Sequence, residues 1–150
     1  MGSRFLAAAT IGLGLVLGLT SIGALGATLQ PQLTRSVWDG VYTPDQATKG
    51  DEIYQQQCMS CHGPTLEGGE MAPGLADGAF RANWNGMTVG DLYDRIHEGM
   101  PPDSPGNLSR EEISEILARV LSANGFPAGE KELPNRPEML KTIQFLSSKP

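Results

Sequence analysis

Two cysteines and a histidine stand together in the motif Cys58-Met59-Ser60-Cys61-His62, and their spacing fits the attachment of a porphyrin. Cysteines three positions apart lie on one face of a helical turn, so both thiols can reach the two vinyl groups of one porphyrin and form thioethers. The histidine that follows is then held beneath the ring, with an imidazole nitrogen directed at the iron. The motif therefore predicts one covalent haem c, attached through Cys58 and Cys61, with His62 as an iron ligand.

Three other interpretations of the cysteine pair remain open at this point. A thioredoxin-like dithiol would follow a strand in a βαβ unit, whereas here a predicted helix precedes the pair and a glycine-rich stretch follows it. A zinc site needs four ligands, and the only Cys or His candidates are Cys58, Cys61, His62 and His97; the adjacent Cys61 and His62 are awkward for a tetrahedron. A structural disulfide stays open for a protein in an oxidising compartment. The histidine and the surrounding loops favour haem over all three.

The second axial ligand of the iron decides the function. A methionine thioether closes the site and raises the reduction potential, which suits an electron carrier; an open position suits ligand binding or peroxide chemistry. Five methionines are candidates: Met59, Met71, Met87, Met100 and Met139. Met100 lies between two predicted helices, before the stiff pair Pro101-Pro102, but position alone leaves it open because methionine is more often core filler. We expect the nearby His97 to face solvent.

Three helices must position these residues. The first is predicted from an N-cap at Thr43, with Pro44 at the first helical position, to about Gln57. The second follows a cap at Thr88 and ends before the Pro-rich loop, and the third runs from a cap at Ser109 to Asn124-Gly125. Residues 63–86 are dense in Gly and Pro and predict a loop with at most one short turn, which a bound cofactor would organise. No alternating apolar run is present, so the fold class is all-α.

The segments outside these helices have separate predicted roles. Residues 1–26 carry one cation at Arg4, an apolar run and small residues at Ala24 and Gly26, which is typical of a secretory signal peptide cleaved after Gly26 or Ala27. The alternative is an uncleaved membrane anchor, since ~20 apolar residues suffice to span a bilayer. Residues 27–42 are predicted to form an extended lead-in whose Trp38 packs on the domain. Residues 43–125 are predicted to form the core, and residues 126–150 a C-terminal strap with a short helix.

The charge of the chain argues against nucleic acid as a partner. The full sequence has 11 basic and 17 acidic residues; without Arg4 it would have 10 and 17, a formal charge of −7. An acidic surface can steer a protein towards basic docking patches, although solubility is the simpler interpretation.

Four stretches carry a resemblance to class I cytochromes c, and within them to the small periplasmic cytochromes associated with pyrroloquinoline-quinone-dependent (quinoprotein) dehydrogenases. They are VYTPDQATKGDEIYQQQCMSCHG, APGLADGAF, NWNGMTVGDLYDRIHEGMPPDSPGNLS and ILARVLSANGFPAG, within residues 38–130. The resemblance implies a cytochrome c fold in which the first and last helices cross at Gly50 and Tyr54.

The resemblance also implies a role for individual site residues. The carbonyl of Pro73 would accept the His62 Nδ1 hydrogen, Leu75 would pack on the ring, and Met100 would be the distal iron ligand. One position departs from the pattern: Arg119 stands where such proteins usually place an aromatic residue, which leaves the partner of Tyr54 open.

Two classes of function follow. The first is a periplasmic electron carrier without a substrate of its own, passing single electrons between a dehydrogenase and a terminal acceptor such as an oxidase. The second is an enzyme role, as the haem c subunit of a quinoprotein dehydrogenase complex or as an open-iron haem enzyme or sensor. The sequence favours the first class, because it contains no second cofactor motif and is too short for a substrate domain.

Overall fold

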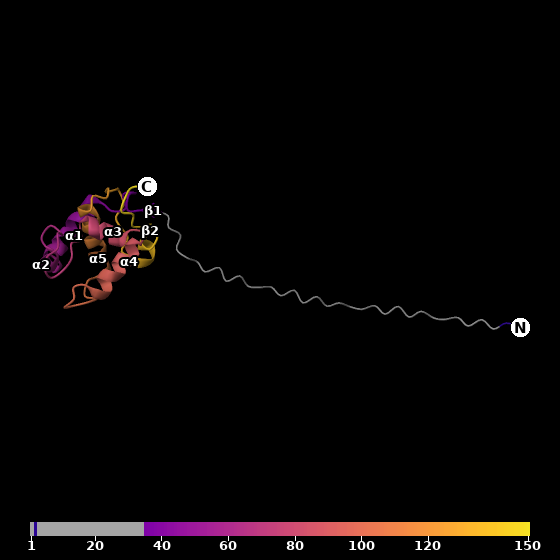
Figure 1. The fold of residues 1–150 in the computed structure, drawn as a ribbon, viewed down its shortest axis with the longest axis horizontal. Helices are drawn as coiled ribbons and strands as arrows, with labels where there is room; N and C mark the ends of the chain where they lie inside the picture. The colour runs from indigo at the N-terminus through magenta and orange to yellow at the C-terminus, as the bar shows by residue number, and fades with distance from the viewer. Residues whose placement is uncertain (1, 3–34) are drawn as a thin grey trace.

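The structure, a computed structural model, describes residue 2 and residues 35–150, so the rest of the predicted signal peptide and residues 27–34 of the lead-in lie outside the described residues. Residues 35–150 form one largely helical domain, as Figure 1 shows. Its elements are β1 (Arg35–Ser36), α1 (Pro44–Gln57), α2 (Met59–His62), α3 (Gly78–Trp84), α4 (Val89–Gly99), α5 (Arg110–Ala123), α6 (Pro137–Leu140) and β2 (Ile143–Gln144). Two strands of two residues do not change the predicted all-α class, which is confirmed.

The crossing of α1 and α5 forms the centre of the domain. Gly50 lies directly against the backbone of Glu115, where an added Cβ would overlap the Glu115 carbonyl. Tyr54, one turn further along α1, is fully buried. The first and last main helices therefore meet where the resemblance implied, and Gly50 allows the close approach because it has no side chain.

The three predicted helix starts are confirmed by their side-chain caps. Thr43 Oγ1 accepts from the backbone N–H of Gln46 at 3.2 Å. At α4 and α5 the bonding is reciprocal: Thr88 with Asp91, and Ser109 with Glu112, each form a capping box. These bonds satisfy N–H groups that lack an intrahelical partner, so they define each start locally.

The prediction of at most a short turn within residues 63–86 is wrong, because α3 occupies seven of those residues. Asp77 caps this helix by accepting from the N–H of Phe80 at 2.6 Å. Phe80 is buried and meets Phe145 edge to face, with ring centroids 6.0 Å apart. A helix this short is marginal alone, and packing against the distant Phe145 stabilises it.

The lead-in and the strap pack on the same core. β1 and β2 pair in parallel, with Arg35 opposite Ile143 and Ser36 opposite Gln144. Trp38 packs on the domain as predicted: its ring meets Phe126 at 4.9 Å, and its Nε1 donates to the Leu146 carbonyl at 3.0 Å. In Figure 1 this strand pair lies on the opposite side of the domain from α2.

A buried amide also fastens the strap to α1. Gln46 Nε2 donates to the Leu133 carbonyl at 2.9 Å, and Gln46 Oε1 accepts from the Leu133 N–H at 2.7 Å. Both bonds are formed away from solvent, where leaving either group unpaired would be costly. Across residues 35–150, none of the helices has the length and apolar character needed to cross a membrane.

Candidate functional site

The two cysteines lie at the end of α1 and in the single turn that follows. The backbone N–H of Cys58 still donates to Tyr54, and both Cys61 and His62 donate their N–H groups to the Cys58 carbonyl, at 3.1 and 3.0 Å. Cys58 and Cys61 are separate thiols that are half-buried. The helical turn therefore presents the two sulfurs one turn apart, as the motif predicts.

The thiol of Cys58 is not an activated nucleophile. Burial, and secondarily the charge of Cys61, raise the pKa of Cys58 to about 11. Reactive dithiols of the thioredoxin kind instead have a lowered pKa at an electropositive position. The environment of Cys58 thus disfavours the dithiol interpretation.

His62 is buried and held by a single hydrogen bond through its ring. Its Nδ1 lies 2.8 Å from the carbonyl oxygen of Pro73. A carbonyl only accepts, so Nδ1 carries a hydrogen, and Nε2 is the ring nitrogen that this bond does not use. A neutral imidazole whose hydrogen is on Nδ1 binds a metal through Nε2. The contact between His62 and Pro73 that the resemblance implied is present.

The histidine loop, residues 63–75, is folded tightly on itself. The Gly68 N–H donates to the His62 carbonyl at 2.7 Å, and the Leu75 N–H donates to the Leu66 carbonyl at 2.8 Å. Leu66 is fully buried with φ of 65°, a left-handed conformation that is rare for a bulky residue. Gly68 lies so close to Gly74 that a side chain would not fit between them. The loop is therefore a rigid support for the Pro73 carbonyl.

Leu75 packs partly buried against the hydrophobic core, and its carbonyl accepts from Asn124 Nδ2 at 2.7 Å. In the sequence, Asn124 is identifiable only as the end of the last helix. It is indeed the C-cap of α5, but its side chain also reaches the histidine loop. No sequence signal pointed to this second contact, because 49 positions separate the two residues.

The five candidate methionines differ in exposure. Met71 is 79% exposed, and Met59, Met87 and Met139 are 36–40% exposed, whereas Met100 is half-buried. Met100 is also the C-cap of α4, with its N–H bonded to the Ile96 carbonyl. Within residues 35–150 no hydrogen bond links Met100 to His62. Figure 1 shows the loop that follows α4 on the same side of the domain as α2.

The structure also places His97 and Arg119. His97 is exposed, as expected, and stacks on Tyr93 with ring centroids 5.8 Å apart. Arg119 Nε donates to Asp51 Oδ1, so the unusual arginine bridges α5 to α1. Tyr54 finds its partner elsewhere: its hydroxyl donates to the Gly63 carbonyl at 2.6 Å.

The donor set fits a haem. It comprises two thiols one turn apart, a buried imidazole whose Nε2 is not used by the Pro73 hydrogen bond, and one half-buried thioether. Among the residues that the structure describes, no three His, Cys, Asp or Glu side chains are grouped so that they could hold a metal ion. The ligand set of the zinc interpretation is thus not assembled in this part of the chain.

Comparisons of the sequence with known proteins match the chain to cytochromes c. The family model described as cytochrome c oxidase, cbb3-type, subunit III, matches residues 45–118. A cytochrome bc1 complex cytochrome c subunit from Corynebacterium efficiens is 26% identical over 106 residues, covering 69% of this chain and 34% of that subunit. Cytochrome c-551 from Bacillus subtilis is 31% identical over 84 residues, covering 55% of this chain and 64% of that protein. The solved structure of the sulfane dehydrogenase SoxCD from Paracoccus pantotrophus matches with a TM-score of 0.48 and 26% identity, covering 72% of this chain and 61% of the other.

These sequence matches support a class I c-type cytochrome, a class that carries covalently bound haem c. It spans about a third of the length of the corynebacterial subunit. The finer resemblance, to cytochromes associated with quinoprotein dehydrogenases, stays a prediction.

Proposed function

We propose that this protein is a single-haem electron carrier. The observation that carries the proposal is the 2.8 Å contact between His62 Nδ1 and the Pro73 carbonyl, which leaves Nε2 of this buried imidazole as the nitrogen available to iron. When bound, haem c takes up and releases single electrons at its iron. The residues of the chain attach this group, orient it and shield it from water.

Each candidate residue has a distinct task in this proposal. Cys58 and Cys61 tether the porphyrin through two thioethers, each formed by adding a thiol S–H across one vinyl group. His62 is the proximal ligand, and Pro73 fixes its tautomer and makes its ring a better electron donor. Leu75 packs against the ring and keeps water away from one face.

Met100 is the proposed distal ligand. It is the least exposed of the five candidate methionines, so its thioether is the one most shielded from water. A neutral sulfur ligand favours ferrous iron and raises the reduction potential, as an electron carrier requires. The competing proposal, an open-iron enzyme or sensor, would leave this position without a protein ligand.

We further propose that the protein works in the periplasm, exported by its N-terminal segment and cleaved near Gly26, and that it is not itself catalytic. Its partners would be redox proteins: a dehydrogenase, of the quinoprotein kind by resemblance, as donor and a terminal oxidase as acceptor. Relatives named as a cytochrome bc1 complex subunit and a cbb3-type cytochrome c oxidase subunit support such partners. A permanent haem c subunit of the dehydrogenase is the alternative within this proposal.

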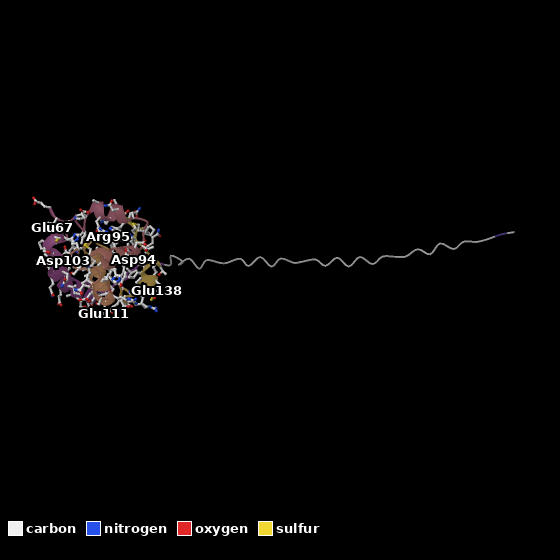
Figure 2. The ribbon with its side chains drawn as sticks, turned by 90° about the horizontal axis from the view of Figure 1, so that it is seen from below. Glu67, Asp94, Arg95, Asp103, Glu111 and Glu138 are labelled. Carbon is white, nitrogen blue, oxygen red and sulfur yellow. The ribbon has the colours of Figure 1, made fainter. Side chains whose placement is uncertain are left out.

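The acidic side chains of residues 35–150 favour solubility as their role and do not form one docking patch. The side chains labelled in Figure 2, among them Glu67, Asp103, Glu111 and Glu138, are spread over the domain rather than gathered. Nucleic acid is not among the proposed partners, because its phosphates would be repelled.

Covalent attachment is the direct test. Acid–acetone extraction should leave haem on the wild-type protein and release it from a Cys58→Ala/Cys61→Ala double variant. Retention of all haem by the double variant would overturn the attachment site. A wild type without a c-type spectrum would overturn the electron-carrier proposal as a whole. Intact mass, together with fractionation, would report whether residues 1–26 are removed and whether the protein is periplasmic or anchored.

A further inference from the structure

The C-cap of α5 carries a buried amide whose bonding goes beyond capping. Asn124 is only 5% exposed, and its Nδ2 donates to the carbonyls of Val120, at 2.9 Å, and Leu75, at 2.7 Å. The Val120 carbonyl already accepts the backbone N–H of Asn124 at 3.1 Å. The contribution that only this side chain makes is therefore the bond to Leu75.

The other polar atom of the same amide is in an unfavourable position. Asn124 Oδ1 is buried and has no hydrogen-bond partner among the residues that the structure describes. Burying an unpaired amide oxygen is destabilising, and an apolar side chain of similar size would avoid it. An asparagine at this position is therefore better explained by its donor group than by its contribution to stability.

The Leu75 carbonyl is mechanically connected to His62. Leu75 is also held through its backbone N–H, which donates to the Leu66 carbonyl at 2.8 Å. Between Leu75 and Pro73 lies Gly74, packed so closely that a Cβ there would stand 2.9 Å from the Glu67 carbonyl oxygen. Residues 73–75 thus form one stiff piece, and a shift of the Leu75 carbonyl displaces the Pro73 carbonyl as well.

We propose that Asn124 is a positioning residue for His62. It does not touch the histidine. It anchors the histidine loop to α5, and so holds the Pro73 carbonyl at the distance that keeps the His62 Nδ1 hydrogen bond short. That bond increases electron donation from the imidazole and favours ferric iron, so loosening it raises the reduction potential. The inference rests on the proposed function, in which His62 ligates the haem iron.

The experiment compares the haem-loaded wild type with Asn124→Leu. This substitution removes the Nδ2 donor and puts an apolar side chain of similar size in its place. Gln46→Leu is the matched control, because Gln46 is also a buried amide with two hydrogen bonds, but it holds Leu133 in the strap. For each protein, the midpoint potential is measured. In the ferrous state, NMR gives the solvent-exchange rates of the His62 Nδ1 hydrogen and the Leu75 amide.

Asn124→Leu should raise the midpoint potential and speed both exchange rates by about fivefold, the factor that corresponds to one net hydrogen bond. Gln46→Leu should lower the stability of the protein but leave the midpoint potential and both exchange rates unchanged. If a haem-containing Asn124→Leu protein shows an unchanged potential and unchanged exchange, Asn124 is only a helix cap and the proposal is overturned.

A wild-type measurement decides the case where Asn124→Leu does not accumulate as holoprotein. Strong exchange protection of the Asn124 side-chain amide supports the anchor, and exchange as fast as that of the exposed Asn107 overturns it. A wild type that lacks covalent haem would show a different failure, that of the proposed function itself, and the proposal would fall with it.

Discussion

The hydroxyl of Tyr54 donates a hydrogen bond to the carbonyl of Gly63 across 2.6 Å. This part-buried bond joins the last turn of α1 to the residue that follows the attachment motif, so it links the two ends of the motif. The aromatic partner that the resemblance led us to look for on α5 is replaced there by Arg119, which bonds Asp51 instead.

Removing this hydroxyl gives a pH-dependent prediction. Tyr54→Phe should lower the free energy of unfolding at pH 7 by about 1 kcal/mol, the net contribution of one hydrogen bond. The pKa of Tyr54 is raised from 10.0 to about 12, chiefly because the side chain is buried, so the folded protein favours the neutral phenol. The associated stability is present below pH 10 and is lost as the pH rises towards 12.

Guanidinium unfolding at pH 7 and above pH 10 checks this prediction. The advantage of the wild type over Tyr54→Phe should narrow at the higher pH. Tyr42→Phe is a useful comparison, because Tyr42 also donates a buried hydrogen bond, to the Phe126 carbonyl, far along the chain from the motif. A gap between wild type and Tyr54→Phe that is constant across this range would contradict the raised pKa.

The close approach at Gly50 predicts that a single methyl group is harmful. Gly50→Ala would force apart α1 and the backbone of Glu115 and should cost about 1–3 kcal/mol of stability. Gly78→Ala, at the first residue of α3, is the control: nothing lies within 4 Å of its added Cβ, so stability should stay unchanged or rise slightly. Thermal unfolding of both variants measures the difference, and equal midpoints would show that the two helices do not meet as described.

Met100→Ala tests the proposed distal ligand. Loss of the sulfur should abolish the weak red sulfur-to-iron band of the oxidised protein and let the reduced protein bind carbon monoxide. The potential should fall by a sizeable fraction of the roughly 0.8 V range that axial ligands span. Absorption spectra and redox titration measure all three properties.

The exposed methionines provide the controls for this experiment. Met71→Ala and Met87→Ala should leave the band, the potential and the lack of carbon monoxide binding unchanged. If Met100→Ala keeps the band and the potential, the distal ligand is elsewhere. If the wild type already binds carbon monoxide readily, the closed electron-carrier site gives way to an open-iron enzyme or sensor.

The sequence by itself determined the features whose partners lie within a few residues. The caps at Thr43, Thr88 and Ser109 each bond a backbone group three positions away, so residue type and spacing sufficed to predict them. The same holds for Cys58, Cys61 and His62, which one helical turn brings together. The all-α class followed from the same local periodicity.

Only the tertiary structure decided the contacts between distant segments. The helix α3 depends on Phe80 meeting Phe145, and the support of His62 includes Asn124, which is 49 positions from the Leu75 carbonyl it holds. Local helix propensity carries no information about such pairs. Phe80 and Asn124 reach their distant partners only when the whole chain is folded. Arg119 shows the same limit: its charge was visible in the sequence, but its bond to Asp51 exists only because α1 and α5 cross at Gly50.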